Sequence, residues 1–283
     1  MLDIIIDALW DGLYIFPFVF LIYVLMEMLE SASNKERIER ALSGNYAPFF
    51  ISLTGIVPEC GFSVMCAKLY DSGFIGIGTL IAAFIATSDE GLVVLLSNMS
   101  SSATVIQLVL WKIVYATFIG ILLNLLLKRF SISHNCPKAN DCIECGERHE
   151  GLFDRFIVHP YCHAVKIFIY IIIVNLCFNT LFYLLGEESI LSFVSSNEVY
   201  QPLLSSLIGL IPNCASSIIL SQAFIKGALS FAGLLAGLSA NAGMGLVILF
   251  RKGKNVKKGL IIIIALYISA VLSGYLAILA STF

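Results

Sequence analysis

The chain has 283 residues, of which 59% are hydrophobic and only 13% carry a charge. That composition is too apolar for a soluble domain of this size and is typical of a polytopic membrane protein. The net charge of −2 gives no sign of a nucleic-acid partner. Because Asp3, Asp7 and Asp11 stand where a cleavable signal peptide would be basic, we expect no such signal.

Taken in chain order, each half contains four apolar stretches. In the first half they cover about residues 13–29, 46–70, 74–96 and 103–127. The first, third and fourth are long enough for a transmembrane helix, which needs roughly 20 residues. The second is cut at Pro58 into pieces of about 12 residues, each too short to span. It therefore predicts either one broken span or a re-entrant hairpin.

The two halves repeat each other at an offset of 154 positions, as Pro58 and Pro212 illustrate. Between residues 46–96 and 200–250, 16 of 51 aligned positions are identical, and prolines, cysteines and glycines stay in step. Chance similarity between apolar segments does not produce that register, so we infer an internal duplication. It divides the chain into a first transmembrane repeat at 1–130, a linker at 131–157 and a second transmembrane repeat at 158–283.

Basic residues decide between a hairpin and a full crossing. If both second stretches are re-entrant hairpins, each half crosses three times and the repeats are inverted. The cytosolic side then holds 15 of the 17 lysines and arginines, leaving only Lys112 and Lys226 outside. If the second stretches cross fully, the split is close to even. The positive-inside rule therefore favours an all-α polytopic membrane protein with two inverted structural repeats, re-entrant hairpins, broken transmembrane helices and both termini outside.

Ionisable residues mark two breaks in the apolar stretches of the first half. The run Gly-Ile-Val-Pro-Glu-Cys-Gly occupies 55–61, and Ala-Thr-Ser-Asp-Glu-Gly occupies 86–91. Small residues in the second run suit an unwound turn. An ionisable group at that depth is a candidate functional site, and no lysine or arginine stands near the second run in the sequence. The candidate ion-binding residues of the first half are Glu59, Cys60, Thr87, Ser88, Asp89 and Glu90.

The second half has the same breaks but supplies amides in place of carboxylates. Three deep carboxylates would be costly around a neutral or anionic substrate, whereas a divalent cation or protons would neutralise them. Carboxylate and amide oxygens with backbone carbonyls suit a hard or borderline ion such as manganese. Cys60 and Cys214 are either softer ligands or small packing residues. The candidate ion-binding residues of the second half are Asn213, Cys214 and Asn241.

One basic residue, Lys112, lies inside the fourth apolar stretch. A lysine in such a place either extends its side chain outward to the membrane surface or pairs with an internal carboxylate. The sequence leaves both alternatives open.

The linker gathers metal-ligand residue types. All four histidines of the chain and four of its eight cysteines lie between residues 134 and 163. Thiolates and imidazoles at such spacings suit a tetrahedral zinc-type site, and a linker in the reducing cytosol is a poor place for disulfides. We expect one zinc-like ion and no organic cofactor. The predicted linker ligands are His134, Cys136, Cys142, Cys145 and His149.

The four motifs and the histidine–cysteine linker together resemble the family of ten-helix heavy-metal exporters. The motifs that carry the resemblance are Gly-x-Val-Pro-Glu-Cys-Gly, Thr-Ser-Asp-Glu-Gly, Gly-Leu-Ile-Pro-Asn-Cys and Ser-Ala-Asn-Ala-Gly. Members of that family are often labelled manganese transporters or arsenic-efflux-like permeases, and the resemblance implies metal export. Ten segments agree with the four stretches per half if each hairpin is counted as two.

These patterns predict a secondary transporter in the plasma or inner cell membrane and no enzymatic activity, since no histidine lies within a span. The substrate would be a divalent cation, with protons as coupling ion and the lipid bilayer as surroundings. The alternative is a cation-coupled anion or organic-anion carrier, including an arsenical carrier, in which helix N-termini at the hairpin tips bind the anion. A homodimer is compatible with both.

Overall fold

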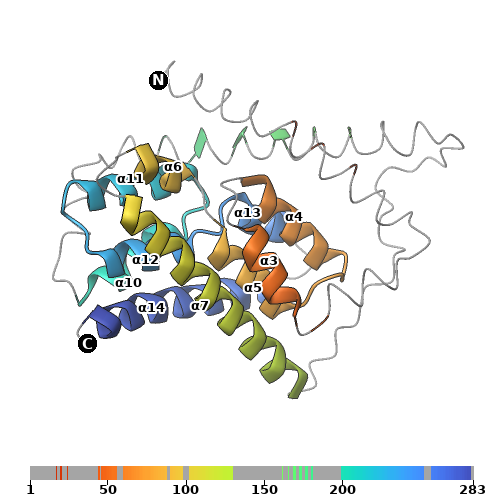
Figure 1. The fold of residues 1–283 in the computed structure, drawn as a ribbon. Coiled ribbons are helices and arrows are strands. Elements are labelled where there is room, and N and C mark those ends of the chain that lie inside the picture. The colour runs from red at the N-terminus through yellow and green to blue at the C-terminus, as the bar shows by residue number, and fades with distance from the viewer. Residues whose placement is uncertain are drawn as a thin grey trace, which may run out of the picture.

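The structure is a computed structural model, and it describes residues 44, 46–55, 60–87, 90–97, 102–129, 199–251 and 256–281, with single positions between 17 and 180. Ten helices make up the described ranges (Figure 1). The predicted first span at 13–29 falls outside these ranges apart from single positions, as does the whole linker. The helices are α3 (Ala47–Thr54), α4 (Cys60–Asp71), α5 (Ile77–Ala86), α6 (Glu90–Ser97), α7 (Ser102–Arg129), α10 (Gln201–Gly209), α11 (Cys214–Ile225), α12 (Phe231–Ala240), α13 (Met244–Arg251) and α14 (Val256–Ser281).

Helix bounds recur at the offset that the sequence predicts. The first residues of α3 and α10, of α4 and α11, and of the three later pairs are each 154 positions apart. Both α4 and α11 end in the same turn, in which a glycine with positive φ (82° at Gly73 and 73° at Gly227) closes the helix. The turn needs a left-handed residue, which glycine supplies without steric cost. The internal duplication is therefore visible as a duplicated pattern of helices and turns.

Four segments are long and apolar enough to cross a membrane: Ile77–Ser97, Thr104–Leu126, Phe231–Phe250 and Val256–Ala280. They correspond to the third and fourth predicted stretches of each half, so the structure is that of a helical multi-pass membrane protein. The pieces of the second stretches, α3 with α4 and α10 with α11, are 8 to 12 residues long. At 1.5 Å per residue, none of these four helices alone spans a hydrocarbon layer about 30 Å thick.

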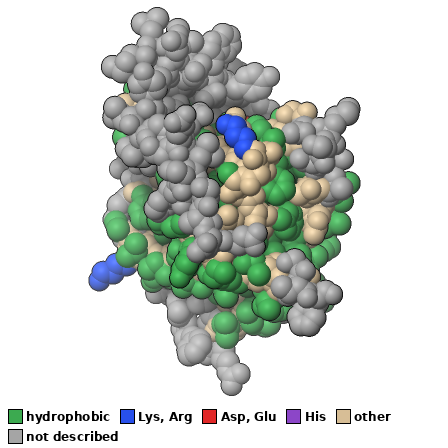
Figure 2. Space-filling view, turned by 90° about the vertical axis from the view of Figure 1, so that its left-hand side faces the viewer, with side chains coloured by type: hydrophobic (Ala, Val, Ile, Leu, Met, Phe, Trp, Pro, Cys, Tyr) green, Lys and Arg blue, Asp and Glu red, His purple; other side chains and the backbone are tan. Residues whose placement is uncertain are grey.

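The broken spans occupy the interior and the unbroken spans the periphery. Three quarters or more of the α5–α6 and α12–α13 segments is buried, against 33% and 39% for the α7 and α14 spans. On α7, large apolar side chains are exposed at every fourth position, at Ile106, Leu110, Val114 and Phe118, and α14 has the same stripe 154 positions later. Hydrophobic side chains also dominate the described part of the face shown in Figure 2. The described parts of the two breaks, at Thr87 and at residues 241–243, are thus enclosed in protein, as irregular backbone in a membrane must be.

The two halves are packed crosswise. Helix α4 of the first half lies against α13 of the second, and α11 of the second lies against α6 of the first (Figure 1). Between them, α5 and α12 are in contact with each other. The hydroxyl of Tyr115 donates to the carbonyl of Ser269, its counterpart 154 positions later, at 2.6 Å. This arrangement brings the breaks of both halves to one central region.

Candidate ion site at the helix breaks

The first break follows α5. Thr87 leaves the helix with φ −54° and ψ 130°. Its side-chain hydroxyl and its backbone N–H both donate to the carbonyl of Ala83, at 2.7 and 2.9 Å. Thr87 is buried, so its own carbonyl is directed into protein and not to solvent. The chain becomes helical again at Glu90, which is half-buried, while Ser88 and Asp89 lie outside the described residues. The predicted break in this span is confirmed.

The second break follows α12 and has the same position in its repeat. Asn241 is extended (φ −77°, ψ 98°), and Gly243 has a positive φ of 52°. The side-chain oxygen of Asn241 accepts the Gly243 N–H at 2.9 Å, which fixes the turn before α13. The Nδ2 amide group of Asn241 and the hydroxyl of Ser239 are buried and have no hydrogen-bond partner. Buried polar groups normally have partners, so these two are available to a ligand.

The break between α10 and α11 in the second half also ends in a cap. Asn213 precedes α11, and its side-chain oxygen accepts the Ala215 N–H at 3.2 Å. Asn213 and Cys214 are both buried. In the first half, Glu59 lies outside the described residues, and α4 begins at Cys60, of whose side chain nothing is described. The amide oxygens of Asn213 and Asn241, predicted as cation ligands, thus each already accept one backbone N–H.

Close backbone contacts join the broken spans of each half to α4 and α11, the second pieces of the interrupted stretches. A Cβ added to Gly91 would stand 2.7 Å from the carbonyl oxygen of Ser217 and 2.8 Å from the hydroxyl of Ser221. Glu90 therefore begins α6 beside the first turn of α11, which Asn213 and Cys214 open. At the equivalent place, the Gly245 N–H donates to the Ser63 hydroxyl at 3.2 Å. We call the α6–α11 contact the first junction and the α4–α13 contact the second junction.

Lys112 connects the breaks of the two halves. Its ammonium group donates to the carbonyl of Thr87 at 2.6 Å and to the carbonyl of Leu238 at 3.1 Å. Only 2% of the residue is exposed. The side chain is therefore turned into the protein, and the alternative of a lysine extended to the membrane surface is wrong. Its nearness to the first break is invisible in the sequence, where it stands 25 positions after Thr87.

Two helix ends supply the oxygens that hold this ammonium. Thr87 follows the last turn of α5, and Leu238 lies in the last turn of α12. The C-terminal end of a helix carries partial negative charge on its unpaired carbonyls, so cations are stabilised there. Around Lys112, backbone carbonyls from both repeats thus converge on one positive charge.

Within the described residues, no group of three or more histidine, cysteine, aspartate or glutamate side chains forms a metal cluster. Glu59, Asp89 and the five predicted linker ligands all lie outside those residues, so they remain predictions. Among the described candidates, Glu90 begins α6, which packs against α11, the helix that follows Asn213. The carbonyl of Thr87 accepts a hydrogen bond from Lys112. Asn241 lies three positions after Leu238, whose carbonyl is the second acceptor of the Lys112 ammonium.

Buried broken spans between intact helices make this a multi-pass helical membrane protein, and discontinuous helices of this kind occur in transporters. Comparison with protein families is consistent with this class: residues 156–282 match the model of a family described as "Putative, 10TM heavy-metal exporter". The match covers most of the second repeat and confirms the family resemblance for that part of the chain, which contains two of the four motifs. No curated protein and no solved structure matches the chain.

Proposed function

We propose that this chain is a secondary transporter that exports a divalent metal cation, with manganese favoured, in exchange for protons. The observation that carries the proposal is the convergence of two helix ends on a cation: the Thr87 and Leu238 carbonyls both accept from the Lys112 ammonium. A protein region that holds a positive charge with backbone oxygens has the chemistry needed to bind a metal ion dehydrated from water.

Carboxylates complete the proposed site. Glu90 begins α6 at the first junction, and Asp89 precedes it by one residue in the chain. Glu59 belongs to the hairpin tip of the first half. A divalent ion would neutralise carboxylates that are otherwise costly in a buried place, and protons would do so during the return of the empty carrier. The proposed ion-binding set is Glu59, Cys60, Thr87, Ser88, Asp89, Glu90, Asn213, Cys214 and Asn241.

The proposed transport mechanism is alternating access between two inverted repeats. Three observations support it: the matched helix bounds, the crosswise packing of α4 on α13 and of α6 on α11, and the uneven distribution of lysines and arginines. In inverted-repeat transporters, the substrate lies near the midplane where discontinuous helices meet, and the repeats rock around it. The proposed orientation puts both termini outside and the linker in the cytosol, where its zinc-like site would favour loading from inside.

A second candidate function is a cation-coupled carrier of an anion, an organic anion or an arsenical. Two observations favour it: Lys112 carries a buried positive charge, and the unpartnered Nδ2 group of Asn241 is a hydrogen-bond donor. Donors of both kinds recognise oxyanions. The metal proposal is preferred because the two hydrogen bonds of Lys112 described above go to carbonyl oxygens, which repel an anion.

Tracer uptake into inside-out membrane vesicles separates the two candidates. We expect manganese to accumulate when the vesicle interior is acidic, and Glu90→Gln to abolish that uptake. Asp71→Asn is the matched control, because Asp71 is an exposed carboxylate at the end of α4 and away from both breaks. Accumulation of arsenite or an oxyanion, with no uptake of manganese, zinc, cadmium or iron(II), would refute metal export.

A further inference from the structure

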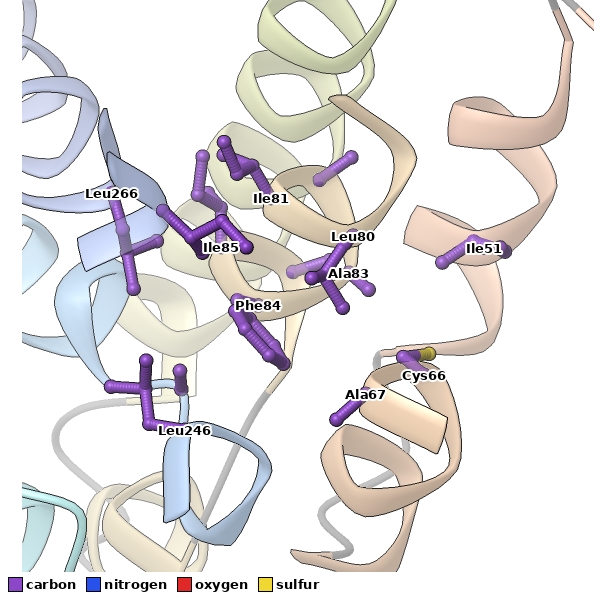
Figure 3. Packing of buried hydrophobic residues seen from close by; sticks show 14 of the residues in the cluster. Ile51, Cys66, Ala67, Leu80, Ile81, Ala83, Phe84, Ile85, Leu246 and Leu266 are labelled. Carbon is purple, nitrogen blue, oxygen red and sulfur yellow. The ribbon is translucent and has the colours of Figure 1, made fainter. Parts of the chain in front are cut away.

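The repeat gives each residue a counterpart, and the counterpart of Lys112 is apolar. Position 266, which is 154 residues later, is Leu266, and it is completely buried. Figure 3 shows Leu266 on α14 facing Phe84 and Ile85 on α5. All three belong to one hydrophobic cluster. Where one half of the molecule holds a cation, the other half holds a close-packed aliphatic side chain.

Other matched positions of the two halves differ in the same direction. The first half has Ile51, Ala67 and Ile85 in its hydrophobic core. The second half has serine at each corresponding position, and all three serines are buried. A fourth difference is Glu90 at the first junction against Met244, which is buried, at the second. The serines are Ser205, Ser221 and Ser239.

Two of these serines have unused hydrogen-bonding capacity. The hydroxyls of Ser221 and Ser239 are buried and lack a partner, whereas Ser205 donates to the carbonyl of Gln201 at 2.7 Å. Ser221 lies against Gly91, the residue after Glu90. Ser239 follows Leu238, whose carbonyl binds Lys112. Since an unmade hydrogen bond in a buried place is costly, each of these hydroxyls is a candidate contact for a ligand, Ser221 beside the first junction and Ser239 beside the break after α12.

We propose that the Lys112 ammonium is a tethered cation that occupies the transport site of the ion-free carrier and competes with the transported cation for the same oxygens. The shared oxygens are the carbonyls of Thr87 and Leu238. The hydroxyls of Ser221 and Ser239 would join them when the ion arrives. The site is thus one-sided: it lies on the side of the first junction, and Leu266 fills the corresponding place on the other side.

This inference deepens the proposed function and rests on it for the identity of the competing ion. A lysine has a flexible four-carbon chain and a compact charge, so it can withdraw from the two carbonyls as one group. The ion can bind only to carriers from which the ammonium has withdrawn. The apparent dissociation constant for the ion is therefore the intrinsic one divided by the fraction of carriers in which the site is open. Such competition would also help release, because the ammonium can reoccupy the carbonyls as the ion leaves.

The position of the cation can be tested without knowing the transported ion. Lys112→Ala removes a propylammonium fragment from the site, so added propylammonium should bind and raise the thermal midpoint of unfolding of Lys112→Ala but not of the wild type. 1-Propanol, the neutral analogue, should raise it much less. Leu266→Ala is the matched control, because it opens a cavity at the equivalent but apolar place. Equal effects of propylammonium and 1-propanol on Lys112→Ala would overturn the proposal.

Ion binding supplies the second measurement, with Lys112→Met in case Lys112→Ala does not fold. If the site is open in about a tenth of wild-type carriers, Lys112→Met should bind manganese about tenfold more tightly. Unchanged or weaker manganese binding by folded Lys112→Met would overturn the proposal. So would the finding that the wild type binds an oxyanion and Lys112→Met does not. If the wild type binds no divalent ion but propylammonium still stabilises Lys112→Ala, the proposed metal substrate is wrong and the tethered cation stands.

Discussion

Crowding the first junction with Gly91→Ala should strongly lower the transport rate while it lowers the unfolding free energy only moderately. In Gly91→Ala, the new Cβ would stand 2.7 Å from the Ser217 carbonyl oxygen and 2.8 Å from the Ser221 hydroxyl. Carbon and carbonyl oxygen ordinarily approach to about 3.3–3.6 Å. Helix α6 must therefore move away from α11 by roughly 0.6–0.9 Å. Overpacking of this kind costs about 1–3 kcal/mol of unfolding free energy.

The shift would separate groups that the proposed site needs together. Glu90 moves with α6, whereas Asn213 and Cys214 move with α11. We expect Gly91→Ala to lower the rate of manganese uptake into inside-out vesicles at least several-fold. The same preparation should unfold at a moderately lower temperature, and its amount in the membrane should remain measurable.

Gly227→Ala is the control for stability alone. A Cβ at Gly227 meets nothing within 4 Å, but the residue has φ +73°, which costs an alanine about 1–2 kcal/mol. This turn follows the opposite end of α11 from Asn213, 14 positions from both Asn213 and Asn241. Gly227→Ala should therefore lose comparable stability and keep nearly normal uptake. If both variants lose uptake in proportion to stability, the close contact at Gly91 has no special part in transport and the reasoning is refuted.

Three further predictions follow from the charge pattern, the linker and the central contacts. Cysteine-accessibility labelling should reach Asn140 only from the cytosol and Glu188 only from outside; labelling of Asn140 from outside would contradict the inverted-repeat orientation. Purified protein should contain one zinc-like ion per chain by elemental analysis, and Cys142→Ser with Cys145→Ser should remove it; protein without metal would refute the linker site. Tyr115→Phe removes the hydrogen bond to Ser269 and should lower the free energy of unfolding by about 1 kcal/mol, because a buried hydrogen bond between the two halves is lost. An unchanged denaturation midpoint would show that this contact does not hold the halves together.

The helix pattern could be read from the sequence because its determinants are local. Pro58 and Pro212 forecast the divisions between α3 and α4 and between α10 and α11, and the small residues around Thr87 and Asn241 forecast the breaks in the spans. The structure has α5 ending at Ala86 and α12 ending at Ala240, as that reading requires. Duplication strengthened the prediction, since each break was observed twice in the sequence.

The crosswise packing and the position of Lys112 could not be read in the same way. Periodicity says that an apolar helix is buried or faces lipid, but it does not say which side of α7 faces α12. One signal was present: Lys112 stands eight residues into the Thr104–Leu126 span, about 12 Å along the helix axis. That depth strains the reach of a lysine to the surface. Comparison with Leu266 would also have shown that the repeat does not require a lysine there.

The candidate site was only partly foreseeable for a different reason. Residue type identified Glu90 and Asn213 as polar groups in apolar stretches, and the structure brings their helices together at the first junction. Ser221 and Ser239 gave no signal, because serines are common among small residues in membrane helices. Their meaning depends on burial without a partner, which is a property of the folded chain alone.

The central claim is that deep carboxylates bind the exported metal ion. Its most direct test is the binding and export of manganese by purified, reconstituted protein carrying Glu59→Gln, Asp89→Asn or Glu90→Gln. Each single replacement should abolish export and weaken manganese binding, while the thermal midpoint stays within a few degrees of that of the wild type. Export of manganese or a related divalent ion at the native rate by all three variants would contradict the claim, and the anion-carrier alternative would then become the better account.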